Sequence, residues 1–384
     1  MSFNDILKLK KQKEESHSET KLYTKYLVVG KDLFSAKVYT ELAKNIEKQN
    51  ITFLSPEKVE SLRDLEWKGP SRARGENMQS LKELIPASEE IEKTDAIFFK
   101  DGKFHPFGSR AKSSPLLEGE EYFKQSTIRF EENGIYPELY NEETQDELLK
   151  SIVNCPIVSV SFNSSPDDLV EPAYWTVALS DGREIKTSNL FWGLHPFLLI
   201  DLLKNKDSLD RHLIEQFQSL RTKSQISVEF QLKNVDFEDS NKTWFLPLSQ
   251  THDWGHFIGD FYTSNDQSVG RFIHFLDEKE VNEDDVAKKL RILKRNFEKI
   301  LDKNKEILGQ EYVRFEEYSD CQKINDKAFQ ELELPFKNLY LYGNNAPFVN
   351  SIEENVNFED SASVPSHFVR GLMTTQNVLQ TCTQ

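Results

Sequence analysis

The sequence has few cysteines and no long apolar run. Cys155, Cys321 and Cys382 are its three cysteines, and no two of them have the CxxC spacing. This odd number without that spacing argues against a disulfide framework and against a thiolate zinc site. No apolar run reaches the ~18 residues of a membrane-spanning helix, and the basic start of the chain lacks the apolar segment of a secretory signal. We therefore expect a soluble, cytoplasmic protein without a membrane span.

Positive charge is also scarce. The 384 residues include 48 Lys and Arg against 64 Asp and Glu, a net charge of −16. Nucleic acid is bound through clustered cations, so this balance argues against it as a partner. No G-x-S-x-G nucleophile motif occurs, and the sequence indicates no catalytic residue. The apolar share of 38% is nevertheless enough for a real core at this length.

The first clear pattern is a strand, a helix and a second strand within about 30 residues. Tyr26–Gly30 is a short apolar run that ends in glycine, which is typical of a buried strand. Apolar residues at helical spacing follow over Leu33–Ile46, and Ile51–Ser55 is a second β-rich run. This order predicts a βαβ unit.

Further along, the sequence alternates between β-rich and helical stretches. Two hairpins are predicted by the Asp-Gly turns at Asp101-Gly102 and Asp181-Gly182. Other strands are expected at Ile226–Leu232, Thr243–Leu248, His256–Tyr262, Val269–Phe275 and Leu339–Tyr342. Helices are expected at Met78–Leu84, Pro196–Leu203, Val286–Ile307 and about Ser366–Thr381. We predict that the stretches around 96–110 and 220–275 form a second, largely antiparallel sheet.

The turn after the first strand is an eroded nucleotide-binding fingerprint. A dinucleotide-binding βαβ unit needs G-x-G-x-x-G, so that backbone N–H groups approach the pyrophosphate at the helix N-terminus. Here the turn reads Gly30-Lys31-Asp32-Leu33-Phe34-Ser35, and only the first glycine remains. The carboxylate of Asp32 would stand where phosphates are expected. Asp32 can instead cap the helix by accepting from backbone N–H groups two or three residues on.

Four segments together resemble one family. Tyr26–Ser55 resembles the opening of flavoproteins in the amine oxidase, protoporphyrinogen oxidase, UDP-galactopyranose mutase and phytoene desaturase superfamily. Trp175–Gly193 is similar to the hairpin of that family that returns to the nucleotide domain. Asn338–Asn344 is similar to its N-L-Y-L-A-G-D strand, and His367–Val378 to the following helix, with Gly371 at a family glycine. The resemblance implies an α/β fold: an FAD-type Rossmann-like dinucleotide-binding domain and a second domain of a largely antiparallel sheet plus helices.

The resemblance also assigns cofactor-binding positions, several of which depart from the family pattern. Asn344 replaces an acidic residue that hydrogen-bonds the ribityl chain, and an amide can partly substitute. Ser55 stands where an acid would bind the ribose, with Glu57 as a late substitute. Thr374-Thr375 stand where Ser-Gly is usual, and the family's Gly-Gly-Arg turn has no clean copy. The cofactor-binding positions are Gly30, Asp32, Ser35, Ser55, Gly343, Asn344 and Gly371.

A substrate pocket is expected in the second domain, from His105, Arg110, Trp254 and His256. Arg110 can clamp an anion through two nitrogens, although a solvated turn arginine is the simpler reading. His256 is a candidate proton donor or an ordinary strand residue. The spacing of His252 and His256 would present two metal ligands on one face only in a helix. This stretch reads as β, so no metal site is expected.

The expected domain division follows the resemblance. Residues 1–21 form a mobile polar tail. Residues 22–95, about 150–205 and 335–384 form the nucleotide-binding-like domain. Residues from about 96–149 and 206–334 form the substrate-like or cap-like domain.

Three functions compete. The first is a noncatalytic or altered relative that binds a small molecule or protein in the interdomain cleft, without stoichiometric FAD. The second is a working FAD-dependent oxidoreductase, like an amine oxidase or desaturase, with a divergent fingerprint, in which the flavin performs the hydride chemistry. The third is an unrelated α/β interaction protein. The eroded fingerprint places the first ahead, because close approach of backbone to phosphate is a steric requirement.

Overall fold

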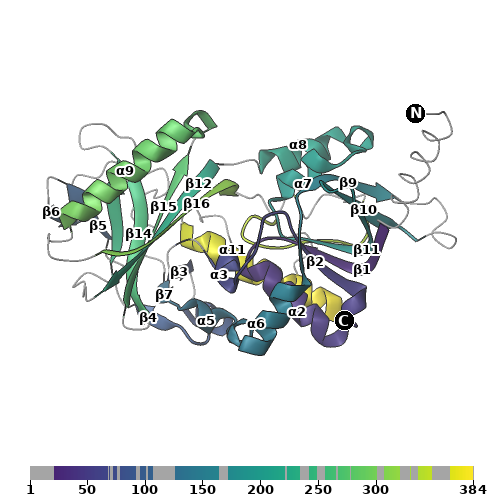
Figure 1. Ribbon diagram of the computed structural model, residues 1–384, viewed down its shortest axis with the longest axis horizontal. Coiled ribbons are helices and arrows are strands. Elements are labelled where there is room, and N and C mark those ends of the chain that lie inside the picture. The colour runs from purple at the N-terminus through teal and green to yellow at the C-terminus, as the bar shows by residue number, and fades with distance from the viewer. Residues whose placement is uncertain are drawn as a thin grey trace, which may run out of the picture.

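In the computed structural model, two lobes lie side by side, each built around a large sheet (Figure 1). Residues 1–20, most of the expected polar tail, lie outside the described set. The residues that the structure describes are 21–67, 69, 72–75, 78–91, 96–100, 103–106, 126–163, 172–220, 223–233, 242–248, 256–264, 267–276, 278–300, 307–320, 329, 336–347 and 364–383.

The first lobe is built on a mixed sheet whose described strands run in the order β8-β2-β1-β11-β10-β9, with β17 paired to the second half of β11. These strands are β1 (Lys21–Val29), β2 (Ile51–Ser55), β8 (Ile152–Asn154), β9 (Ile157–Asn163), β10 (Tyr174–Leu179), β11 (Glu184–Trp192) and β17 (Leu339–Leu341). β1 pairs in parallel with β2 and β11, whereas β10 pairs antiparallel with β9 and β11. The strand near the end of the chain therefore shares a sheet with β1, as predicted.

The alternation of side chains along β1 supplies two apolar cores. Val28 points to a core closed by α2 (Leu33–Asn45) and α11 (Val364–Thr383). Leu27 and Val29 point to the opposite core, which α7 (Pro196–Leu202) and α8 (Arg211–Ser219) cover. Because all three side chains are fully buried, the central strand has helices on both faces, as expected for a parallel sheet. The shorter helices of this lobe are α3 (Leu62–Leu65), α4 (Met78–Leu84), α5 (Glu132–Ile135) and α6 (Glu142–Ser151), with 3₁₀ turns at Lys48–Asn50, Pro137–Tyr140 and Lys206–Ser208.

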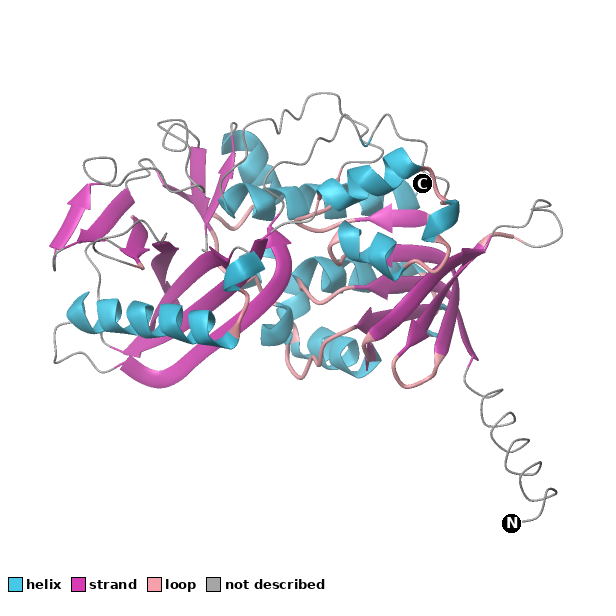
Figure 2. Ribbon diagram, turned by 90° about the horizontal axis from the view of Figure 1, so that it is seen from above, coloured by secondary structure: helices cyan, strands magenta, loops and turns pink. Residues whose placement is uncertain are grey.

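The second lobe is the predicted, largely antiparallel sheet (Figure 2). Its described strands run in the order β16-β12-β15-β14-β13-β5-β6, and only β13 and β5 pair in parallel. They are β5 (Ala96–Lys100), β6 (Lys103–Pro106), β12 (Lys223–Lys233), β13 (Thr243–Pro247), β14 (His256–Ser264), β15 (Gln267–Leu276) and β16 (Ile307–Asp320). α9 (Glu283–Ile300) follows a 3₁₀ turn at Glu278–Glu280 and covers one face. Its Phe297 ring packs against Phe230 and Phe272 in the core, with centroids 4.4 and 5.0 Å apart.

Two parts of this fold differ from the sequence prediction. The helix predicted to reach Ile307 ends at Ile300, and Ile307 instead begins β16, where it pairs with Leu232 of β12. Three short strands, β3 (Arg72–Gly75), β7 (Ser126–Arg129) and β4 (Glu89–Ile91), form a small sheet that the sequence did not predict. Each has only three or four residues, too few for alternation to be read.

The described residues contain neither a membrane-spanning helix nor a metal-binding cluster. No described helix is both long and apolar enough to cross a membrane. Among the same residues, no group of three or more His, Cys, Asp or Glu side chains is arranged to hold a metal ion.

Candidate functional site

Three strand ends meet at one edge of the first sheet, and each ends in a glycine. Gly30 follows β1 and donates its N–H to Leu54 O at 3.0 Å. Gly193 follows β11 and donates to Val29 O at 2.7 Å, and Gly343, with a φ of 98°, lies two residues beyond β17. Ligands of open α/β sheets bind outside the carboxyl ends of the strands, so we call this edge the nucleotide-like site.

Asp32 caps the first helix at this site, as predicted. Its Oδ1 accepts from Ser35 N at 2.9 Å and from Ser35 Oγ at 2.6 Å. A Cβ added to Gly30 would lie 1.8 Å from Ser35 Oγ, and one added to Gly343 would lie 3.9 Å from the second Asp32 oxygen. The carboxylate therefore stands between the start of α2 and the end of the last strand.

Tyr342 fills the space beside that carboxylate. Its side chain is 1% exposed, its hydroxyl donates to Val29 O at 3.1 Å, and a Cβ on Gly193 would lie only 2.5 Å from its ring. A second buried hydroxyl, Tyr136, lies near the same carboxylate. Burial raises the pKa of both tyrosines above its usual value, and the negative charge of Asp32 raises it further.

The expected ribose position is also engaged within the chain. Ser55 is fully buried, and its hydroxyl donates to Glu57 O at 2.8 Å. The Glu57 carboxylate pairs with Lys31 Nζ at 2.6 Å. Glu57, the possible substitute for the acidic residue that would bind the ribose, is thus paired with Lys31 from the turn after β1.

The helix that follows β17 is held against the site by close packing. A Cβ on Gly371 would lie 2.4 Å from the Phe34 ring. Phe368 on α11 stacks on Phe130, with centroids 4.4 Å apart and planes at 11°. Thr374 Oγ1 accepts from Gly343 N at 3.0 Å. Asn344 is half-buried beyond this glycine.

In this arrangement the nucleotide-like site does not fit the pyrophosphate of a dinucleotide. The Asp32 carboxylate takes a helix N-terminal donor that a phosphate would use, and two negative groups there would repel. The Tyr342 ring fills the space beside Gly30 and Gly193, where the absence of a side chain would otherwise let a ligand come close to the backbone.

The residues expected to form a substrate pocket are only partly described, since Arg110 and Trp254 lie outside the described residues. His105 lies on β6, half-buried and opposite Phe98 of β5. His256 is 7% exposed, with its ring edge-on to Phe98 at 5.2 Å and Phe245 at 6.1 Å. Both histidines thus border Phe98, and their substrate-binding role stays a prediction.

Sequence reasoning missed a buried polar chain in the second lobe. Lys289 Nζ lies 3.2 Å from His274 Nε2 and 2.8 Å from Glu280 Oε1. An ammonium only donates, so His274 is neutral and its Nδ1–H donates to His256 O at 2.9 Å. Burial, and then the Lys289 charge, lower the pKa of His274 to about 4.

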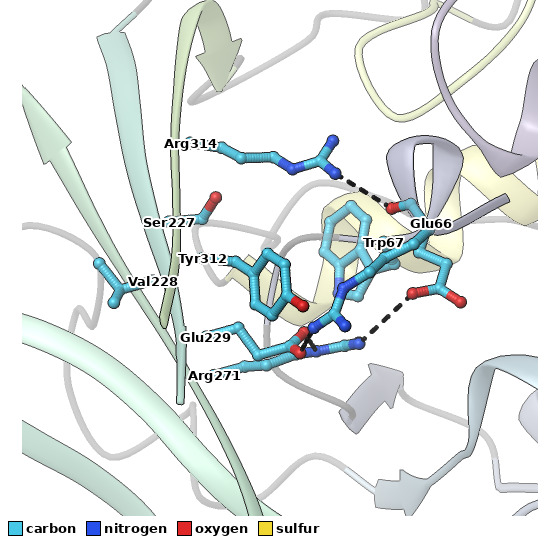
Figure 3. A pocket seen from close by; sticks show the side chains of 9 residues that line it. Glu66, Trp67, Ser227, Val228, Glu229, Arg271, Tyr312 and Arg314 are labelled. Carbon is cyan, nitrogen blue, oxygen red and sulfur yellow. Dashed lines mark hydrogen bonds and ion pairs between the residues drawn. The ribbon is translucent and has the colours of Figure 1, made fainter. Parts of the chain in front are cut away.

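The other missed group lies between the lobes, around a cavity of about 20 Å³ (Figure 3). That volume holds about one water molecule, so it admits neither a flavin ring nor a typical substrate. Figure 3 shows Glu229, Arg271 and Tyr312 reaching from the second sheet toward Glu66 and Trp67 of the first lobe. No local sequence signal identifies such a cluster, because its members come from distant segments.

Comparisons with known proteins agree with this architecture. The sequence matches no family model and no curated protein. Among solved structures, the chain is similar to an oxidoreductase from Methanosarcina mazei, with a TM-score of 0.54 and 9% identity, covering 92% of this chain and 100% of the other. It is similar to reduced UDP-galactopyranose mutase, with a TM-score of 0.52, 8% identity, and coverage of 94% and 96%.

A double mutant of putrescine oxidase gives a TM-score of 0.51 at 9% identity, covering 94% of this chain and 100% of the other. At these identities the likeness concerns the fold alone. Over most of its length, the chain shares the fold of these solved structures of an oxidoreductase, a UDP-galactopyranose mutase and a putrescine oxidase.

Proposed function

We propose that this protein uses the flavin amine oxidase-like fold without a bound flavin, as a noncatalytic binding protein whose ligand or partner enters the interdomain cleft. The observation that carries the proposal is the Asp32 carboxylate at the start of α2, which accepts from Ser35 N at 2.9 Å. It stabilises the helix end that a phosphate would otherwise stabilise. The fold therefore keeps its βαβ unit without needing the nucleotide.

Tyr342 and Lys31 support the same proposal. The buried Tyr342 ring fills the edge where Gly30 and Gly193 end their strands. Lys31 neutralises Glu57, the remaining carboxylate near the ribose position. In both places, a side chain of this protein takes a position or a partner that a bound dinucleotide would otherwise use.

The test compares native protein with variants of the cap. Native protein is expected to purify colourless, and added FAD is expected to show no saturable quenching of flavin fluorescence. Asp32→Gly with Tyr342→Ala removes the carboxylate and the ring together, and is expected to gain measurable FAD binding. The matched control is Asp210→Gly, because Asp210 caps α8 in the same way, accepting from His212 N at 2.8 Å and Leu213 N at 3.4 Å. Native protein carrying one flavin per chain would refute the proposal outright.

The alternative is an FAD-dependent oxidoreductase with a divergent motif. The fold of the neighbours favours it, and so does the retained order of strand, glycine and helix at Gly30. It predicts a yellow native protein whose colour is lost on unfolding, and a flavin reduced by an added substrate. The third hypothesis, an unrelated α/β interaction protein, is the least favoured, because the chain has the same fold as a solved oxidoreductase over most of its length.

A further inference from the structure

The two lobes have separate apolar cores. The cores of the first lobe and the core of the second lobe share no described residue. In the described part of the chain, no helix or strand of the first lobe packs extensively along an element of the second sheet. Within the described residues, the lobes therefore share no extended apolar interface, and small polar interfaces permit relative motion.

A charge cluster connects the two lobes. It is formed by Arg63, Asp64 and Glu66 of the first lobe and Glu229, Arg271 and Arg314 of the second. Each lobe contributes at least one arginine that pairs with a carboxylate of the other. Arg63 pairs with Glu229, and its guanidinium lies 3.4 Å from the ring centroid of Tyr312.

Arg314 makes the reverse contact. It donates to Asp64 O at 2.8 Å and Arg63 O at 3.2 Å, two carbonyls in the last turn of α3, and to the Asp64 carboxylate at 2.9 Å. A cation at a helix C-terminus satisfies such carbonyls.

The inner part of the cluster is buried and shared. Glu229 binds Arg63 through one oxygen and Arg271 Nε through the other, at 3.0 Å, and Arg271 lies 4.0 Å from Glu66. The Arg271 side chain is 5% exposed and that of Glu229 is 17%. Three guanidinium groups face three carboxylates, so the cluster has no excess charge with which to bind an ionic ligand. Apart from the Arg271–Glu229 pair, its ion pairs are made between the lobes.

We propose that this charge cluster is a salt-sensitive latch, which holds the two lobes together when its ion pairs form and lets the lobes separate when they break. Screening shortens the range of charge from ~10 Å at ~0.1 M salt to ~3 Å at ~1 M. The less buried pairs, Arg314–Asp64 and Arg63–Glu229, are screened before the more buried Arg271–Glu229 pair, which stays within its own sheet. The lobes therefore part along α3. The latch is independent of whether the chain binds a flavin.

The test uses the full chain in small-angle X-ray scattering and hydrogen exchange. Native protein is expected to show a larger radius of gyration at ~1 M than at ~0.1 M salt. Arg314→Gln and Arg63→Gln are expected to show the larger radius already at low salt, with amide exchange in α3 about tenfold faster. The control is Arg211→Gln, which removes a surface pair with Glu215 on α8 and is expected to behave as native.

Two results would overturn the proposal. One is a radius of gyration that is the same for native protein at both salt concentrations. The other is exchange in α3 that is no faster in either latch variant than in Arg211→Gln. Circular dichroism identifies a variant that is unfolded, and the salt series on native protein then decides the question alone.

Discussion

His274 makes the stability of the second lobe depend on pH in a way that can be calculated. Its ring is buried beside Lys289, and the pKa of the folded state is lowered from 6.5 to about 4 by burial first and by that ammonium second. Above pH 6.5 both folded and unfolded chains hold the ring neutral, so its contribution to stability is fully present. As pH falls, His274 becomes protonated in the unfolded chain while it stays neutral in the folded chain. Stability is therefore lost until the ring is protonated in the folded chain as well.

The size of the effect follows from the shift. One pKa unit corresponds to about 1.4 kcal/mol, so the loss between pH 6.5 and about 4 approaches about 3 kcal/mol. The groups facing the ring are Lys289, Glu280 and His256. Of these, Lys289 opposes protonation of the ring and Glu280 favours it. Most of the loss should therefore be measurable before the protein reaches pH 4.

The assay is urea unfolding at about pH 7 and about pH 4.5, followed by tryptophan fluorescence. For each protein, the free energy of unfolding at the lower pH is subtracted from that at the higher pH. In His274→Gln this difference should be smaller than in native protein by about 2.5 kcal/mol. His212→Gln, which removes an exposed histidine on α8, should match native protein. Equal differences in native protein and His274→Gln would refute the reasoning.

Three further predictions concern packing, each measured by thermal unfolding. Gly371→Ala should destabilise the first lobe by about 1–3 kcal/mol despite the better helix propensity of alanine, because the new Cβ would lie 2.4 Å from the Phe34 ring; an increase in stability would contradict the close packing. Gly182→Ala meets no atom within 4 Å but keeps a φ of 89°, so it should cost only about 1 kcal/mol of backbone strain, and a larger loss would indicate an unseen contact. Phe297→Ala should cost about 3–5 kcal/mol through the cavity that it leaves; a loss below about 1 kcal/mol would show that the sheet core collapses freely.

The sequence predicted those parts of the fold that are encoded locally. Tyr26–Gly30 and the cap at Asp32 are readable because a buried strand, a turn and a helix start each have a signature within a few residues. The resemblance placed β17 beside the first sheet for a similar reason, since its strand ends in Gly343. The end of α9 was missed, because Ile307 continues a helical spacing although pairing with β12 makes it a strand.

The candidate site was predictable only in part. That Asp32 opposes a phosphate follows from its position in the turn, whereas the role of Tyr342 depends on glycines that end two other strands. Arg63 and Glu229 come from different lobes, and nothing in either local sequence indicates the pair. The domain boundaries and the pocket roles of His105 and His256 stay predictions.

The position of β17 has a consequence for how the chain acquires its structure. The second half of β11 pairs with β1 on one side and with β17 on the other. Five strands of the second lobe, β12 to β16, come between β11 and β17 in the sequence, and its other two, β5 and β6, come before β11. During synthesis, the whole second lobe is therefore made before β17, the strand that pairs with Leu190 and Phe191. Contacts over such long separations form slowly, and unpaired apolar strand edges promote aggregation meanwhile. We expect the second lobe to fold first, as an insertion, and the nucleotide-like site to be the last region of the protein to become ordered.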